Sequence, residues 1–127
     1  MADLGNPSVA ELLARMVAKE FYLIENCLLA EVTELATKLR EHLLYMIDLE
    51  KAGVLFLSGP LYDETGAMTG GGVTIVRASS FEEAERIALN DPFVVAGYRK
   101  PKIRRWVVNE GRVSLCLDLS DGKVSID

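Results

Sequence analysis

The chain has 127 residues, of which half are hydrophobic and 26% are charged, a balance typical of a folded protein with one core. A net charge of -5 argues against binding to nucleic acid or to an anionic membrane, because phosphate contacts need an excess of Lys and Arg. No apolar run approaches the roughly 20 residues that span a bilayer, and no basic segment followed by an apolar one opens the chain, so we expect a cytoplasmic protein. With one histidine and no Cys-x-x-Cys pair we expect no metal site, and we expect Cys27 and Cys116 to be reduced and buried.

Hydrophobic periodicity predicts the elements of the first half of the chain. The stretch "NPSVAELLARM" is typical of a short amphipathic helix, and "KEFYLIENC" is typical of a strand. From Leu29 to Ala52 the apolar residues recur at a helical period, and Gly53 ends that segment. The stretch "VLFLSGPLY" then predicts a buried strand that ends at Gly59-Pro60.

The second half predicts one further helix between strands. We expect "YDETGAMTGGG" to be a loop, with its three glycines in a flexible hairpin, and "GVTIVRA" to be a strand. Ser80 and Glu83 form a capping box that opens a helix. The stretch "KPKIRRWVV" follows as a strand, and the five basic residues of "YRKPKIRRW" are typical of a solvated edge. The stretch "RVSLCLDLSDGKVSID" predicts a hairpin that turns at Asp121-Gly122.

The central order of strand, helix, strand, strand, helix, strand predicts an α+β, ferredoxin-like fold. We expect a single domain over residues 1–127, with a helical extension (1–18), a core (19–109) and a C-terminal hairpin (110–127). In this plan both helices cover one face of the sheet, and the other face is left apolar and open. We therefore expect a homodimer or a higher homo-oligomer.

Four stretches in this order, "REHLLYMIDLEKAGVLFLSGPL", "GGGVTIV", "SFEEAERIALNDPFVVAGY" and "KIRRW", resemble the YciI-like (YCII) family of the dimeric α+β barrel group. The marks that carry the resemblance are a helix histidine, a Gly about ten residues later, a Gly-Pro at a strand end and an Asp-Pro-Phe after the second helix. The resemblance implies a small enzyme that needs no cofactor, of muconolactone isomerase type or linked to dehydrochlorination in aromatic breakdown. It also implies that His42 and Asp91 are the catalytic pair.

The residues themselves leave more than one interpretation open. Asp91-Pro92 is a good N-cap and first residue for a short helix that Gly97 would end, and a capping carboxylate is held in its ionised form. Asp91 is then a poor proton donor but a fixed anion that could orient His42. The lone histidine is either a boundary residue with one hydrogen bond or the group that takes and returns a proton near neutral pH.

The topology predicts where the site lies. The end of the first strand, with Asn26, meets Ser58, Gly59, Pro60 and Asp91 at one end of the sheet. We expect Asn26 and residues 58–60 to bind the substrate, although residues 58–60 also fit a plain strand end and turn. A helix that began at Ala30 would carry His42 about 18 Å away from that end. We therefore expect the main helix to begin late, after a loop or separate turn over residues 28–34, so that His42 reaches Asp91.

Three functions remain open from the sequence. The first is a lyase or isomerase that acts on a small organic acid or an aromatic-breakdown intermediate, with His42 as acid and base. The second is a noncatalytic ligand-binding or assembly module of the same fold, and the third is a cofactor-independent monooxygenase. A free ring nitrogen on His42 facing a pocket favours the enzyme, whereas a ring packed shut favours the module.

Overall fold

The computed structural model describes residues 5–126, which divide into two compact units. The larger unit spans residues 20–107, and the smaller one combines the two ends of the chain, residues 1–19 and 108–127. The single-domain organisation therefore stays a prediction. Among residues 5–126 no helix is long and apolar enough to span a bilayer.

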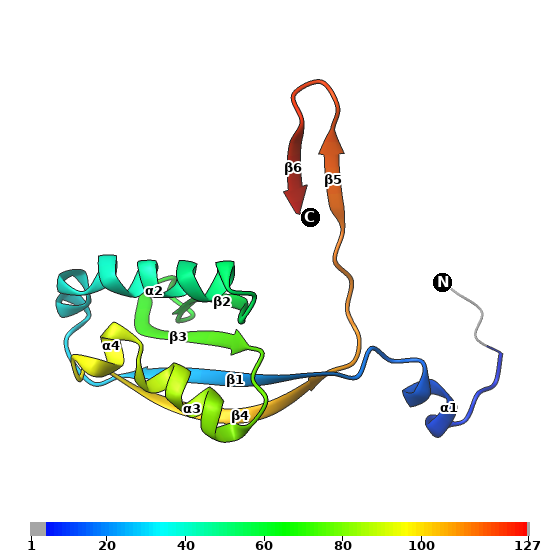
Figure 1. Cartoon of the computed structure of the whole chain (residues 1–127), viewed down its shortest axis with the longest axis horizontal. Helices are drawn as coiled ribbons and strands as arrows, with labels where there is room; N and C mark the ends of the chain where they lie inside the picture. The colour runs from blue at the N-terminus through cyan, green and yellow to red at the C-terminus, as the bar shows by residue number, and fades with distance from the viewer. Residues whose placement is uncertain (1–4, 127) are drawn as a thin grey trace. The chain divides into compact units, whose positions relative to one another are not determined.

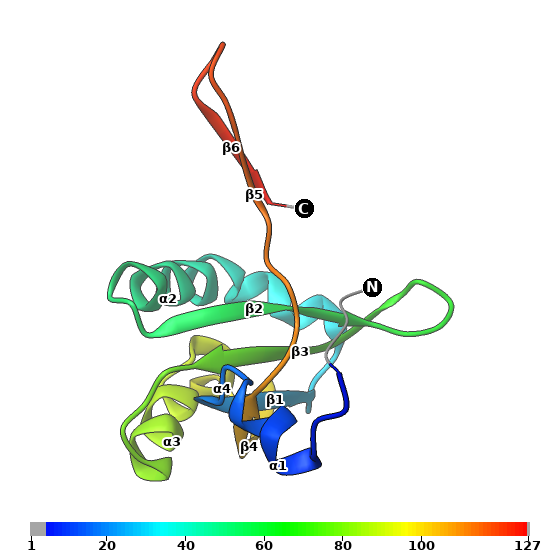
Figure 2. The same cartoon turned by 90° about the vertical axis from the view of Figure 1, so that its right-hand side faces the viewer.

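The larger unit contains the predicted ferredoxin-like order of elements (Figures 1 and 2). Its strands are β1 (Lys19–Leu28), β2 (Leu55–Tyr62), β3 (Met68–Val76) and β4 (Arg99–Val108), and its helices are η1 (Val32–Thr37), α2 (Leu39–Lys51), α3 (Phe81–Leu89) and α4 (Pro92–Val95). The sheet order is β2-β3-β1-β4, and β3 pairs antiparallel with both of its neighbours. The α+β, ferredoxin-like prediction is confirmed.

The smaller unit holds the two predicted additions. Helix α1 (Val9–Ala14) begins at Ser8, whose hydroxyl accepts the N–H of Glu11. Strands β5 (Leu115–Asp118) and β6 (Lys123–Ile126) form an antiparallel hairpin. The turn between them contains Gly122 at φ +68, a left-handed conformation that favours glycine.

The two main helices lie on the same face of the sheet but pack differently. In both views α2 lies near β2, and α3 and α4 lie near β1 and β4 (Figures 1 and 2). Ala84 and Ala88, one turn apart on α3, are buried in one cluster with Ile24 and Val76 of the sheet. Small side chains let α3 approach the sheet closely. Helix α2 has no buried residue, so the space between α2 and the sheet is not filled.

The late start of the long helix is as predicted. Residues 32–37 form a separate 3-10 helix, and α2 begins only at Leu39, which sets His42 in its first turn. The strand that follows differs from its prediction, because β2 continues through Gly59 and Pro60 to Tyr62 and most of its side chains are exposed. Strand β2 is at the edge of the sheet, where a proline can be accommodated because its missing N–H would face outward.

The glycine run was wrongly predicted as part of a loop. Strand β3 begins at Met68, so Gly70, Gly71 and Gly72 lie inside the sheet, and the turn is confined to residues 63–67. The reason is close packing: a Cβ on Gly71 would lie 2.5 Å from the main-chain oxygen of Asn26 on β1. Glycine within a strand marks such close backbone approaches as well as turns.

The predicted burial of the cysteines is also wrong. Both Cys27 and Cys116 are exposed. Cys27 follows Asn26 on β1 and therefore points to the face of the sheet opposite the helices. Cys116 lies on β5, all of whose side chains are exposed. Neither position has a second layer to cover it.

Candidate active site

A hydrogen bond joins His42 to Asp91, as predicted from the topology. His42 Nδ1 lies 2.8 Å from Asp91 Oδ1, and the two side chains are 11% and 3% exposed. An ionised carboxylate only accepts hydrogen bonds, so the proton in this contact belongs to Nδ1. In the neutral ring Nε2 is then left as the acceptor, which is the tautomer that a general base requires.

Asp91 serves as a helix cap and as the partner of His42 at the same time. The same Oδ1 atom that accepts from His42 also accepts the backbone N–H of Phe93 at 2.9 Å. Pro92 is the first residue of α4, and Gly97 follows its end at φ +79, as the sequence predicted. The bond to the Phe93 N–H holds the Asp91 carboxylate in place, so the carboxylate in turn orients the imidazole of His42.

The imidazole ring is also held by stacking. Phe93 is 2% exposed, and its ring lies 4.3 Å from that of His42 at an interplanar angle of 18°. On the same side of α2, the Tyr45 hydroxyl donates to the Ile87 carbonyl at 2.7 Å. Burial raises the pKa of Tyr45, and the charge of Asp91 raises it further, so the phenol stays protonated and keeps this bond.

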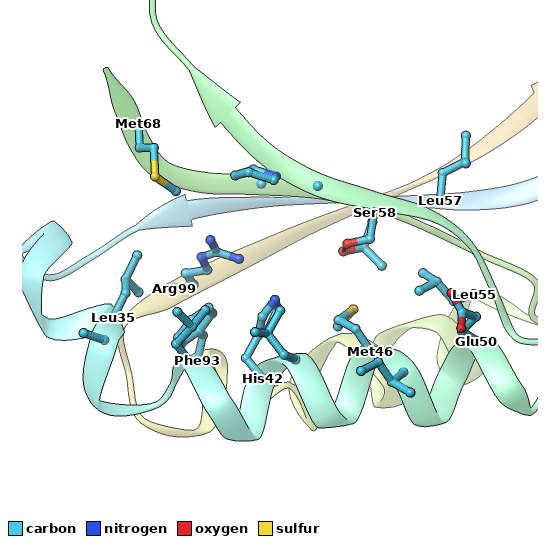
Figure 3. Close-up of a pocket in the computed structure, with 18 of the residues that line it drawn as sticks. Leu35, His42, Met46, Glu50, Leu55, Leu57, Ser58, Met68, Phe93 and Arg99 are labelled. Carbon is cyan, nitrogen blue, oxygen red and sulfur yellow. Dashed lines mark hydrogen bonds between the residues drawn. The ribbon is translucent and has the colours of Figure 1, made fainter. Parts of the chain in front are cut away.

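One side of helix α2, including His42, lines a cavity of about 650 Å³ between the helix and the sheet (Figure 3). Its volume is within the range of small-molecule sites. The walls are mostly apolar and are formed by residues of η1, α2 and α4 and of strands β2, β3 and β4. The polar side chains that reach it are His42, Ser58, Thr74, Arg99 and Glu50.

The predicted substrate-binding residues divide between the cavity and the sheet. Ser58, Gly59 and Pro60 line the cavity, and the Ser58 hydroxyl lies 3.1 Å from that of Thr74 on the neighbouring strand. Asn26 is 4% exposed, is not among the lining residues, and has an Oδ1 without a hydrogen bond in the described part of the chain. Its role in substrate binding stays a prediction.

Arg99, which the sequence did not single out as a site residue, is 8% exposed and lines the cavity near His42 (Figure 3). The basic segment that contains it predicts a solvated edge. That description holds for Arg104 and Arg105, which are exposed and pair with Glu25 and Glu20. Strand alternation was the available signal, because Arg99 shares the inward side of β4 with positions 101 and 103.

His42 Nε2 makes no hydrogen bond to any residue between 5 and 126. The ring is among those that line the cavity and projects from α2 toward the strands (Figure 3). Within the same range, no three His, Cys, Asp or Glu side chains gather as the ligands of a metal would. The site can therefore take a proton from a bound molecule and return it, with Asp91 beside the imidazolium that forms in between.

The fold and the site together define a ferredoxin-like α+β protein with a histidine and carboxylate pair beside an apolar cavity. Residues 20–107 match the family model of the YCII-related domain, so the chain belongs to this family. The family was the one suggested by the sequence motifs.

A solved structure has the same fold. It is 5-chloro-2-hydroxyhydroquinone dehydrochlorinase from Burkholderia phenoliruptrix AC1100, in complex with 2,5-dihydroxybenzoquinone. The two chains are 23% identical, the match covers 69% of this chain and 93% of the other, and the TM-score is 0.57. No curated protein sequence matches the chain.

Proposed function

We propose that this protein is a lyase or isomerase that needs no cofactor and moves a proton on a small organic acid or an aromatic-breakdown intermediate. The observation that carries the proposal is the His42–Asp91 bond of 2.8 Å, with the other nitrogen of the ring left for the cavity. The likeness in fold to a dehydrochlorinase supports the same reaction class. The apolar walls would exclude water from the step and strengthen the electrostatic interactions within it.

In the elimination form of the reaction, His42 Nε2 takes a proton from a carbon or hydroxyl of the substrate. The electrons of the broken bond form a new double bond, and the leaving group departs with its own bonding pair as an anion such as chloride. In the isomerisation form, the imidazolium returns the same proton to another carbon. In both forms Asp91 orients the ring and stabilises its charged state, and it exchanges no proton.

The experiment is a search for proton transfer with defined probes. Chlorinated hydroquinones and unsaturated lactones are incubated with the protein in D₂O, while chloride release and carbon-bound deuterium are followed by ion chromatography and NMR. With a probe that reacts, His42→Ala should lower turnover by about a hundredfold or more. Glu41→Gln, on the exposed side of the same turn, should not change it. Full activity in His42→Ala would instead indicate the noncatalytic ligand-binding module.

We also propose that the protein assembles as a homodimer through the open face of the sheet. Leu57 pairs with Ile75 in the row next to the pair of Ser58 and Thr74, so its side chain points to the other face of the sheet, although the residue also borders the cavity. Figure 3 shows Leu57 on the side of the sheet opposite α2. Leu57 and Trp106 are large, apolar and exposed, and a second copy of the sheet would cover both.

A further inference from the structure

Arg99 brings a positive charge to the inner wall of the cavity. Its side chain is 8% exposed, and it has no carboxylate within salt-bridge distance among residues 5–126. The charge of Asp91 acts on Arg99 without a salt bridge, and Asp91 Oδ1 already accepts from His42 and from the backbone of α4. A cation that has left water without a counter-ion is costly unless a bound group balances it.

The contacts of Arg99 hold the guanidinium in one orientation and leave one end of it available. Its Nε donates to the Gly70 carbonyl at 2.8 Å, and its Cζ lies 4.6 Å from the centre of the Phe93 ring. Neither terminal nitrogen has a hydrogen-bond acceptor in the described part of the chain. The two terminal nitrogens therefore form a fixed fork with unused N–H groups.

The glycine run of β3 provides the space that this orientation needs. A Cβ on Gly72 would lie 3.4 Å from Nη1 of Arg99 and 3.0 Å from the Gly59 oxygen. A side chain at position 72 would therefore crowd the main-chain oxygen of Gly59 and touch the guanidinium. This contact gives a reason for glycine at a position where the backbone conformation does not require it.

We propose that Arg99 binds a carboxylate of the substrate, end-on through its two terminal nitrogens. This inference rests on the proposed function and specifies its substrate class: a small, largely apolar organic acid. Two parallel N–H groups match the two oxygens of a carboxylate, and such bidentate pairs are the stronger kind of hydrogen bond. Arg99 and His42 both contact the ring of Phe93 and line the same cavity, so an acid held by the guanidinium would occupy the cavity that the imidazole faces.

The test is the binding of benzoate and of its neutral analogue benzamide, measured by isothermal titration calorimetry at pH 7.5. The wild type should bind benzoate more tightly than benzamide. Arg99→Gln should weaken benzoate at least tenfold and leave benzamide within about twofold. Lys102→Gln removes a charge from the exposed side of the same strand and should leave both ligands as in the wild type.

A second pair of variants repeats the test while keeping the positive charge of Arg99. Gly72→Ala should shift the guanidinium and lose the preference for benzoate, whereas Leu89→Ala shortens an exposed side chain that does not line the cavity and should keep it. This pair decides the question if Arg99→Gln does not fold. Failure of the wild type to bind benzoate at 10 mM, equal losses of both ligands, or a full preference in Arg99→Gln would each overturn the proposal.

The result is separable from the proposed catalysis. His42→Gln should lose turnover and still prefer benzoate to benzamide. If that variant loses the preference while Arg99→Gln keeps it, the carboxylate is bound by the imidazole, and the assignment to Arg99 is wrong. If Arg99 sets the preference but His42→Ala keeps full turnover, the proposed proton transfer fails and the carboxylate site stands.

Discussion

Substituting Asp91 tests whether one oxygen atom both caps α4 and holds His42. In Asp91→Ala the cap of the Phe93 N–H is lost, at a cost of about 1 kcal/mol. The Nδ1–H of His42 is also left without its partner in a mostly buried position, which costs about 1–3 kcal/mol. The free energy of unfolding should therefore fall by about 2–4 kcal/mol.

Asp91→Asn separates geometry from charge. An asparagine oxygen can accept from the Phe93 backbone and from His42 at once, because both bonds end on the same atom in the wild type. Asparagine is also as good an N-cap as aspartate. The variant should therefore lose about 1 kcal/mol or less, while the stabilising charge next to the imidazolium is gone and turnover falls about tenfold.

The assays are urea unfolding at pH 7 and the nitrogen NMR spectrum of the imidazole, which needs no assignment because the chain has one histidine. In the neutral ring of the wild type the proton should be on Nδ1, and in Asp91→Ala the two tautomers should mix. Ser80→Ala removes the cap of α3, which involves no histidine, and should cost only about 1 kcal/mol. An Asp91→Ala variant within 0.5 kcal/mol of the wild type would refute the reasoning.

Three further predictions concern stability and assembly. Hydrogen bonds from the Ser79 side chain and backbone hold the pKa of Glu83 below its usual range, so the bond contributes above the unfolded pKa and is lost as the pH falls through the folded one. The unfolding free energies of the wild type and Glu83→Gln, measured from pH 7 to pH 3, should therefore converge in acid; a constant gap would contradict this. Tyr45→Phe leaves the Ile87 carbonyl without its donor and should cost about 1 kcal/mol in urea unfolding, whereas an unchanged midpoint would show that the bond is replaced. In sedimentation at micromolar concentration the wild type should have twice the mass of one chain and Leu57→Asp that of one chain; a monomeric wild type would rule out the dimer.

The parts of the fold that the sequence predicts are those with local signals. The Asp-Pro pair marks the start of α4 and Gly97 marks its end. Both signals are local, because each residue acts on its own backbone or on the next turn. The late start of α2 was predicted in a different way, from the length of a helix and the position that His42 needed. That argument works because helix rise is nearly constant, so the distance along the axis follows from residue numbers.

The parts that the sequence did not predict depend on contacts between strands. Gly71 and Gly72 look like a turn in the sequence, since the oxygens of Asn26 and Gly59 that crowd them belong to neighbouring strands. The role of Arg99 was not predicted for the same reason, because it also depends on contacts with other elements. Its segment is basic as a whole, and only the inward side of β4, next to the cavity and to Phe93, distinguishes it from the exposed arginines that follow.

The three residues Asp91, Pro92 and Phe93 show why a simple helix stop would not serve here. Asp91 accepts two hydrogen bonds on one oxygen, and Pro92 fits the first position of α4, where no backbone donor is needed. Phe93 donates its backbone N–H to that oxygen and presents its ring to both His42 and Arg99. A glycine could end α3, but it could neither orient the imidazole nor support the guanidinium. The first residues of the short helix α4 therefore serve both the fold and the proposed chemistry.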